Sequence, residues 1–191
     1  MNELLLARHG ETEWSADGRH TSRTDLPLTD NGRRLARRLA PRLADRRFAL
    51  VLTSPMRRAV ETCELAGLGE EAEVRDELRE WDYGDYEGIT TPDIRRERPR
   101  WWLWRDGGPG GESPADVAAR CDRLVAELSA IAGPERDDDV LCVAHGHILR
   151  ALAARWLERP VDLGGHLVLS TGSISRLGWE RDVRALVVWN G

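Results

Sequence analysis

The chain alternates between short apolar runs, which are typical of buried strands, and longer segments with apolar residues at helical spacing. The apolar runs predict strands over residues 3–8, 48–54, 72–75 and 140–147, and the tail, 166–190, predicts two or three more. Strands that are apolar on both faces and alternate with helices form mostly parallel sheets covered by helices. The pattern therefore predicts an α/β fold.

Helical spacing predicts four helices, over 29–47, 56–66, 113–132 and 148–158. In the first, Pro41 lacks an N–H and is expected to bend the helix. The third begins with Ser113, which suits an N-cap, and Pro114, which suits the first helical position. Between these elements, residues 78–111 are irregular and rich in aromatics, with room for one short helix after "TTPD".

The length of 191 residues favours one domain over 1–191, with the irregular segment 78–111 as a lid-like element. The chain has no apolar run long enough for a membrane span, and its first residues lack a basic region and a cleavage site. We therefore expect a soluble, cytoplasmic protein. The three cysteines have no CxxC spacing and are expected to be small core residues.

Charge excludes several classes of chemistry. All 28 basic residues are arginine, so a P-loop lysine, a Schiff base and pyridoxal phosphate are excluded. The net charge of −5 makes non-specific binding to nucleic acid unfavourable. We therefore expect neither a nucleic acid nor a membrane as a partner.

Polar residues follow three of the predicted strands. "LLLARHG" ends in Arg8 and His9, "LCVAHG" ends in His145, and "SPMRRA" places Arg57 and Arg58 after a third strand. In parallel sheets the ligand crevice lies beyond the carboxyl ends of the strands, so these side chains are expected to meet there. Histidines and arginines that converge in this way form an anion site, and phosphate matches the planar fork of arginine.

Other interpretations of these residues exist. A single histidine at a strand end is often only a hydrogen-bonded structural residue, and a lone arginine is often a surface charge. His145 and His147 form an H-x-H pair that, with His9 or His20, could hold a metal ion. No carboxylates gather near these motifs and the arginines would repel a cation, so the sequence predicts no metal.

Four motifs in order carry a family resemblance: "ARHGETEW", "LTSPMRRAVET", "ELREWDYGDYEG" and "VAHGH". Together they resemble the histidine phosphatase superfamily, branch 1, the phosphoglycerate mutase-like proteins. The resemblance implies a three-layer α/β/α fold and a phosphohistidine intermediate. It also implies that Arg58 belongs to the site while Arg57 is a surface residue, and that Glu80 is the proton donor.

The resemblance implies the following chemistry. His9 attacks phosphorus, and a backbone group near Gly10 holds its other ring nitrogen. Arg8, Arg58 and a protonated His145 surround the phosphoryl oxygens, so that no metal or other cofactor is required. Glu80, partly buried in the aromatic segment, gives a proton to the leaving group and later takes one from water.

Hydrolysis and transfer are distinguished by departures from the mutase pattern. Similar mutases have a longer span between the third and fourth motifs, Asn where this chain has Ser15, and Gly in place of the second residue of Thr21-Ser22. These differences favour a phosphatase. A phosphoglycerate mutase-type transfer and a non-catalytic protein that binds a phosphorylated ligand remain as alternatives.

The third and fourth motifs resemble the subgroup of sugar phosphatases that includes sedoheptulose bisphosphatase, which implies a small sugar phosphate as substrate. The expected substrate contacts are Ser15, Thr21, Ser22, Tyr83, Gly146 and His147. Trp101, Trp102 and Trp104 either line the pocket, where indoles would stack on a sugar, or only cover the loop. The C-terminal strands either pair across a homodimer interface or simply complete the sheet.

Overall fold

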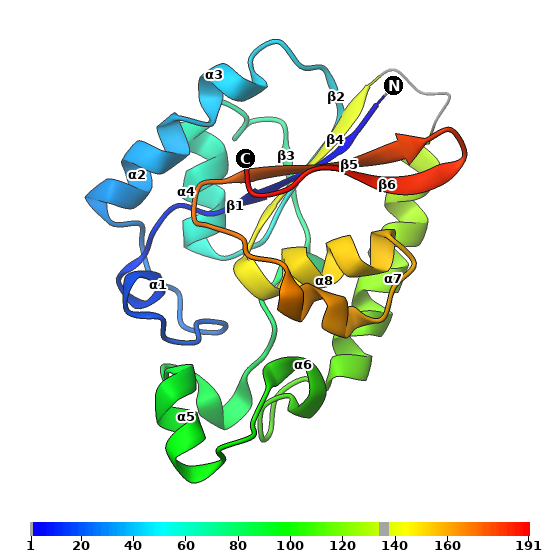
Figure 1. Cartoon of the computed structure of the whole chain (residues 1–191). Coiled ribbons are helices and arrows are strands. Elements are labelled where there is room, and N and C mark those ends of the chain that lie inside the picture. The colour runs from blue at the N-terminus through cyan, green and yellow to red at the C-terminus, as the bar shows by residue number, and fades with distance from the viewer. Residues whose placement is uncertain (1, 134–137) are drawn as a thin grey trace.

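The computed structural model describes residues 2–133 and 138–191 and is built on one six-stranded sheet (Figure 1). The strand order is β3-β2-β4-β1-β5-β6; β1 to β4 are mutually parallel, whereas β5 and β6 run antiparallel to their neighbours. The sheet is thus mostly parallel, as predicted. The strands are β1 (Leu4–Arg8), β2 (Phe48–Thr53), β3 (Ala72–Val74), β4 (Asp139–Ala144), β5 (Ile174–Glu180) and β6 (Val183–Val188).

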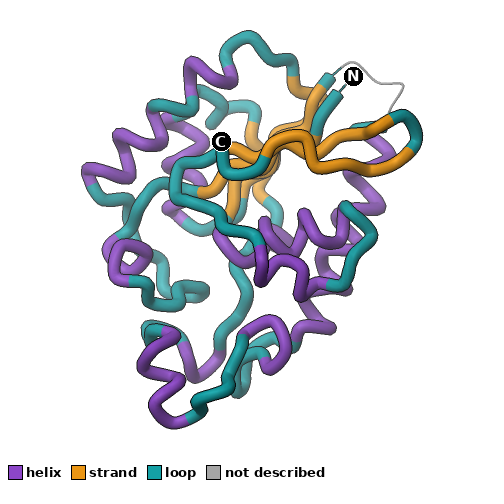
Figure 2. The backbone as a smooth tube through the Cα atoms, in the orientation of Figure 1, coloured by secondary structure: helices purple, strands orange, loops and turns teal. Residues whose placement is uncertain are grey.

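Helices lie on both faces of the sheet, and Figure 2 shows them around the central strands. The α-helices are α1 (Glu13–Asp17), α2 (Asp30–Arg37), α3 (Ala40–Leu43), α4 (Arg57–Leu65), α5 (Thr91–Glu97), α6 (Leu103–Asp106), α7 (Pro114–Ile131) and α8 (Gly146–Trp156). Three 3-10 turns, η1 (Asp76–Leu78), η2 (Gly84–Tyr86) and η3 (Val161–His166), complete the elements. Within the described ranges no helix is long and apolar enough to cross a membrane.

The three layers follow from the two-residue period of the central strands. In β1, Leu4 and Leu6 join the apolar core that includes α7 and α8, whereas Leu5 and Ala7 join the core that includes residues of α3 and α4. Strand β4 alternates between the two cores in the same way. Because both faces of the central strands are buried, the expectation of continuous apolar runs is confirmed.

The predicted helix over 29–47 is two helices. Helix α2 begins after Thr29, whose hydroxyl accepts a hydrogen bond from the N–H of Gly32, and it ends at Arg37. Pro41 lies in the first turn of α3, where a missing N–H costs nothing. The expected bend at Pro41 is therefore a break between two helices.

The predicted strand over 140–147 was too long. Strand β4 ends at Ala144, His145 is the N-cap residue of α8, and Gly146 is already helical. The apolar run and its polar end are continuous in sequence, but the chain changes from strand to helix within one residue. The side chain of His145 is thereby placed at the carboxyl edge of the sheet.

The aromatic segment, residues 78–111, forms 3-10 turn η2 and two short helices, α5 and α6, of which only α5 was expected. Three glycines allow the two ends of this segment to pack closely. A Cβ on Gly84 would lie 2.0 Å from the Pro109 carbonyl oxygen, and a Cβ on Gly108 would lie 2.0 Å from the Tyr83 carbonyl oxygen. A Cβ on Gly111 would lie 2.2 Å from the Asp82 carbonyl oxygen. Two stretches of backbone therefore pack against each other without space for side chains. Helix α1 was not predicted, because it has only one turn and its N-cap, Thr12, lies inside the first motif.

Candidate active site

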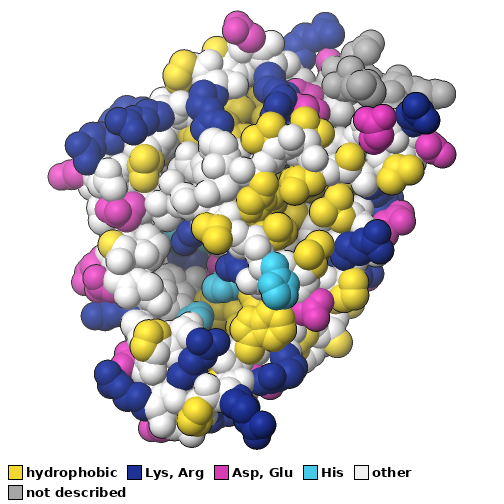
Figure 3. Space-filling view, viewed as in Figure 1, with side chains coloured by type: hydrophobic (Ala, Val, Ile, Leu, Met, Phe, Trp, Pro, Cys, Tyr) yellow, Lys and Arg dark blue, Asp and Glu magenta, His cyan; other side chains and the backbone are white. Residues whose placement is uncertain are grey.

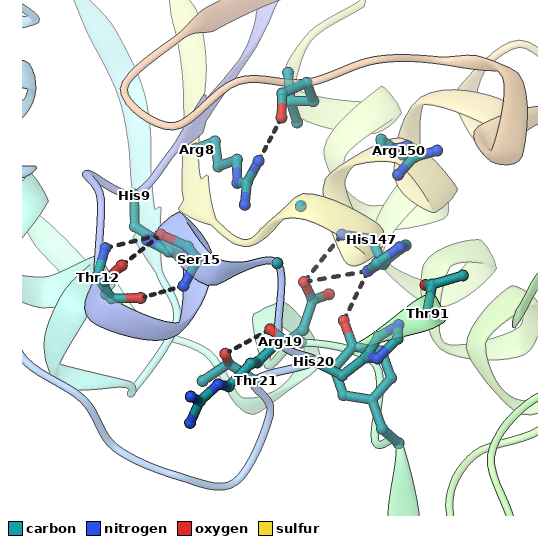
Figure 4. Close-up of a pocket in the computed structure, with 15 residues that line it drawn as sticks. Arg8, His9, Thr12, Ser15, Arg19, His20, Thr21, Thr91, His147 and Arg150 are labelled. Carbon is teal, nitrogen blue, oxygen red and sulfur yellow. Dashed lines mark hydrogen bonds and ion pairs between the residues drawn. The ribbon is translucent and has the colours of Figure 1, made fainter. Parts of the chain in front are cut away.

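A cavity of about 180 Å³ lies at the carboxyl edge of β1 and at the N-terminus of α8 (Figure 4). Eight of the predicted site residues line it: Arg8, His9, Ser15, Thr21, Glu80, Tyr83, Gly146 and His147. The remaining three, Ser22, Arg58 and His145, lie behind the cavity wall. The strand ends therefore meet as the parallel sheet predicts.

His9 is held as a neutral base. Its Nδ1 lies 2.6 Å from the Gly10 carbonyl oxygen, to which it donates, so the proton of the neutral ring is on Nδ1 and Nε2 carries a free lone pair. Burial and the guanidiniums of Arg8 and Arg58 lower the pKa of His9 well below its usual value. The expected backbone contact near Gly10 is confirmed, and the ring is prepared to act as a nucleophile through Nε2.

The guanidinium of Arg8 has one hydrogen-bond donor, Nε, without a partner in the described chain. One terminal nitrogen of its guanidinium donates to the Leu169 carbonyl, whereas Nε has no acceptor among the residues that the structure describes. A Cβ on Gly146 would lie 3.3 Å from this guanidinium, so the glycine leaves space for Arg8. A buried donor without a partner is costly, and because the Arg8 side chain also lines the cavity, an anion bound there would lie beside this guanidinium charge.

Arg58 is fully buried and binds protein groups. Its Nε donates to Nδ1 of His145 at 3.1 Å, and its terminal nitrogens donate to the carbonyl oxygens of Thr21, Ser22 and Thr24 at 3.0 to 3.2 Å. Arg58 therefore fixes the loop after α1 and orients His145.

The protonated state expected for His145 is contradicted. Its Nδ1 accepts from Arg58 and its Nε2 lies 2.7 Å from Ser54 Oγ, to which it donates, so the described contacts fit a neutral ring. Burial and the Arg58 guanidinium lower the pKa of His145 well below its usual value. Burial disfavours the charged ring, and the neighbouring Arg58 guanidinium disfavours a second positive charge.

Glu80 is buried, as expected, and its carboxylate caps helix α8. Oε1 accepts from the N–H of Ile148 at 2.8 Å and of Trp81 at 2.9 Å, and Oε2 accepts from the N–H of His147 at 3.0 Å. A carboxylate is favoured at a helix N-terminus, where N–H groups are free. Oε1 has both of its lone pairs occupied, whereas Oε2 keeps one, so Oε2 is the oxygen that can exchange a proton.

Tyr83 and His147 form a polar pair. The Tyr83 hydroxyl lies 2.7 Å from Nδ1 of His147. Burial and the charge of Glu80 raise the pKa of Tyr83, whereas burial and Arg150 lower the pKa of His147. The phenol therefore donates to a neutral imidazole, whose own proton is on Nε2.

Ser15 and Ser22 have hydroxyls that are used within the fold. Ser15 Oγ accepts from the Thr12 N–H at 2.8 Å in the capping box of α1, although the residue lines the cavity. Ser22 Oγ donates to the Glu80 carbonyl oxygen at 3.3 Å and lies outside the cavity. The hydroxyl of Ser22 therefore steadies the backbone of Glu80.

The three tryptophans form a layer behind the cavity wall. Trp101 contacts His20 edge to face at 5.5 Å between ring centroids, and Trp104 lies 5.6 Å from His147. Trp101 and Trp104 are buried and Trp102 is half-buried, and none of them lines the cavity. Of the two expectations for these residues, packing is the one that the contacts support.

Comparison with known proteins identifies the family of this chain. The family model described as histidine phosphatase superfamily (branch 1) matches residues 4–191. The chain belongs to the histidine phosphatase superfamily. The expectation of a phosphoric monoester hydrolase is confirmed by this family and by the phosphatases among its relatives.

This histidine phosphatase is similar to two curated relatives and to one solved structure. An acid phosphatase of Mycobacterium tuberculosis is 46% identical over 189 residues, which cover 98% of this chain and 91% of that protein. A sedoheptulose 1,7-bisphosphatase of Saccharomyces cerevisiae is 37% identical, with 80% of this chain and 66% of that protein covered. The solved structure of the open reading frame Rv3214 product from Mycobacterium tuberculosis superimposes with a TM-score of 0.93 and 43% identity, over 99% of this chain and 97% of that chain.

Sequence reasoning missed several residues that line the cavity of this histidine phosphatase: Thr12, Gly18, Arg19, His20, Thr91, Arg150 and Leu169. Arg150 lies one turn beyond His147 on α8, a spacing that could have revealed it. His20 donates to the Ile89 carbonyl oxygen at 2.6 Å, a contact that its interpretation as a metal ligand does not predict. In the part of the chain that the structure describes, no three His, Cys, Asp or Glu residues gather as a metal site.

Proposed function

We propose that this single-domain chain hydrolyses a small phosphorylated metabolite, a sugar phosphate, through a phosphohistidine on His9 and without a metal cofactor. The observation that carries the proposal is the pair at the end of β1. His9 has a free Nε2 lone pair, and Arg8 beside it has a buried Nε donor with no acceptor in the described chain. A nucleophile next to an unsatisfied cation suits a phosphoryl group.

In the first half of the reaction, Nε2 of His9 attacks phosphorus and the bond from phosphorus to the substrate oxygen breaks. Oε2 of Glu80 gives its proton to that oxygen, so an alcohol leaves and Glu80 becomes a carboxylate. Arg8 supports the negative charge on the transferring group, while Arg58 and His145 support the site from behind it.

In the second half, water attacks phosphorus and the bond from phosphorus to Nε2 breaks. Glu80 takes a proton from the attacking water, and inorganic phosphate leaves. Glu80 then holds the proton that the next cycle uses, so both halves balance. The three N–H groups on the carboxylate keep Glu80 in one orientation through both halves.

The rest of the cavity supports a small, polar substrate. Arg19 and Arg150 line it together with Thr21, Thr91 and the Tyr83–His147 pair, and its volume is below that of drug-sized pockets. Three arginines and one carboxylate give the lining a net positive charge. Relatives named sedoheptulose 1,7-bisphosphatase and glucosyl-3-phosphoglycerate phosphatase support a phosphorylated sugar that carries a second anionic group.

The test is phosphate release in excess EDTA from a panel of sugar monophosphates, sugar bisphosphates and phosphoglycerates. We expect the wild type to release phosphate, His9→Ala to lose at least about a thousandfold in kcat/KM, and His166→Ala, at an exposed histidine, to match the wild type. Release that survives His9→Ala, or that stops with EDTA, contradicts the proposal. Transfer of phosphate between positions of one substrate without release supports a mutase, and binding without turnover supports a non-catalytic protein.

A further inference from the structure

Residues 19–24 form a loop that closes one side of the cavity. Arg19, His20 and Thr21 line the cavity directly and are labelled together in Figure 4. Figure 3 shows histidine and arginine side chains in the hollow on this face of the molecule. Apart from an isolated bridge between Arg19 and Thr90, the loop has no regular secondary structure. Its path is therefore set by contacts with other parts of the chain.

Two charged side chains bind the backbone of this loop through opposite groups. Arg58 donates to the carbonyl oxygens of Thr21, Ser22 and Thr24 at 3.0 to 3.2 Å. Glu87, which is half-buried, accepts from N–H groups of the same loop. Both of its carboxylate oxygens lie 2.9 Å from the Ser22 nitrogen, and Oε1 lies 3.0 Å from the Thr24 nitrogen. The loop is therefore bound by a cation on its acceptors and by an anion on its donors.

A single peptide group connects the two charges. The carbonyl of Thr21 and the N–H of Ser22 belong to the same peptide bond, so the group that accepts from Arg58 also donates to Glu87. A peptide dipole between a cation and an anion strengthens both hydrogen bonds, most of all where water is excluded. Arg58 gains from this link because it is fully buried and its hydrogen bonds within the described chain all go to neutral groups.

We propose that Glu87 is a positioning residue for the reaction. Through the peptide between Thr21 and Ser22 it fixes the guanidinium of Arg58. The Nε of Arg58 in turn donates to Nδ1 of His145 at 3.1 Å and orients that ring. Glu87 does not line the cavity, so it acts through these groups and not on the substrate. Its role in the reaction rests on the proposed function, whereas its link to His145 is a property of the free protein.

The residues that follow Glu87 hold the same loop by their backbone. The N–H of Gly88 donates to the His20 carbonyl oxygen at 2.8 Å. The Ile89 carbonyl oxygen accepts from the His20 N–H at 3.0 Å and from the His20 Nδ1 at 2.6 Å. These contacts do not use the Glu87 carboxylate, so the loop is expected to stay in place when only the charge is removed.

Nitrogen-15 NMR of His145 in the ligand-free protein tests the link. Glu87→Gln removes the charge and keeps an oxygen that can accept from the loop. In the wild type, Nδ1 of His145 should have the resonance of a ring nitrogen that accepts a hydrogen bond, because Arg58 donates to it. In Glu87→Gln, this resonance should move toward that of a ring nitrogen without a donor. An unchanged resonance overturns the proposal.

Asp106→Asn is the matched control, and circular dichroism checks that both variants are folded. Asp106 also accepts from a backbone N–H in the aromatic segment, that of Trp102 at 2.8 Å, but its charge is paired with Arg105. This variant should leave the His145 resonance unchanged. An equal shift in Asp106→Asn and Glu87→Gln overturns the proposal, because it would come from a general change in the segment.

Calorimetry with inorganic phosphate measures the consequence for the site. We expect Glu87→Gln to raise the phosphate dissociation constant at least about fivefold, and Asp106→Asn to leave it unchanged. Equal affinity of Glu87→Gln and the wild type overturns the role of Glu87 in the reaction. A wild type that does not bind phosphate would count against the proposed function, whereas the NMR result would stand on its own.

Amide hydrogen exchange in the wild type tests the same link without any substitution. If the contact between Glu87 and the loop favours phosphate binding, phosphate must favour the contact, because coupling between two sites is reciprocal. We expect saturating phosphate to slow exchange of the Ser22 and Thr24 N–H groups and to leave that of the Trp102 N–H unchanged. Exchange at Ser22 that is unaffected by bound phosphate overturns the proposal.

Discussion

The proposed phosphate end of the cavity, formed by Arg8 and His9 with His145 behind them, and the aromatic segment (residues 78–111) that faces it are held in place by different means. Arg8 and His9 end a strand that is hydrogen-bonded on both sides, so the sheet fixes their backbone. Tyr83 and Glu80 lie in a segment without strands, which is held by glycine contacts and by the N-terminus of α8. The comparison shows that the sheet positions Arg8 and His9, whereas Glu80, the proposed proton donor, and Tyr83 depend on individual contacts.

Glu80 is the residue where the two regions meet, so Glu80→Gln is expected to have the largest effect. The amide cannot donate or accept the reacting proton, and kcat on an alkyl phosphate should fall about 10²- to 10⁴-fold. With p-nitrophenyl phosphate, whose leaving group needs no proton, a burst of one product per enzyme should precede slow turnover. Glu97→Gln, at an exposed position, is the matched control. Full turnover of the alkyl phosphate by Glu80→Gln would remove Glu80 from its role.

The stability of both regions is expected to depend on pH in the same direction. Burial lowers the pKa of His9 and His145 at the phosphate end and of His20 and His147 on the aromatic side. Below the usual value of 6.5 the unfolded chain gains protons that the folded chain does not. Stability is therefore fully present above this pH and falls as pH drops toward the lowered pKa values, by roughly 1.4 kcal/mol per pH unit for each histidine.

Urea unfolding between pH 7.5 and 5.5 measures this dependence. His20→Gln removes one of the four groups, and its pKa is lowered less than those of the other three, so the slope of unfolding free energy against pH should become shallower by at most about a quarter of its histidine part. A slope that is unchanged in this variant would show that His20 does not contribute.

Gly108→Ala tests whether the aromatic segment is rigid. A Cβ at this position would lie 2.0 Å from the Tyr83 carbonyl oxygen, so the backbone must move, at an expected cost of about 1 to 3 kcal/mol in unfolding free energy. Gly133→Ala is the control, because its nearest neighbour, the Ser129 carbonyl oxygen, lies at 3.5 Å. Equal unfolding free energies of the two variants in urea would mean that the backbone of the segment moves to accommodate the Cβ and is not rigid.

Tyr83→Phe is expected to have the smallest effect. It removes the hydroxyl that donates to His147 and leaves the packing of the ring. We expect substrate binding to weaken by about 1 kcal/mol, which raises KM roughly fivefold. Tyr86→Phe removes a hydroxyl that binds Arg98 and should leave KM unchanged. An equal rise of KM in both variants would indicate a general effect on the aromatic segment and would contradict a specific role of the Tyr83 hydroxyl.

The sequence predicted the phosphate end well because two local signals agree there. Apolar runs define the strands, and Arg8, His9 and His145 follow directly after them, so the parallel topology is enough to bring them together. The backbone contact of His9 near Gly10 was implied by the family resemblance, and the structure contains it. The charge of His145 was predicted wrongly, because it depends on the contact with Arg58, a residue 87 positions away in the sequence.

The rest of the cavity lining and the aromatic segment were predicted less well. Arg19 and His20 reach the cavity from the loop after α1, where no periodic pattern marks them, whereas Arg150 is marked only by its helical spacing from His147 on α8. Helix α6 has only four residues, too few for a helical period to be visible. Trp101 and Trp104 were left between two roles because the sequence does not show which face of a ring is covered.

The glycine contacts of the aromatic segment have a consequence for which of its positions can vary. Gly84, Gly108 and Gly111 fix the path of the backbone, but the outward residues of α5 take no part in those contacts. A library that randomises exposed positions of α5 should yield mostly folded proteins, whereas one that includes the glycines should not. Evolution can therefore vary the outer surface of this segment freely while Tyr83 and Glu80 keep their places.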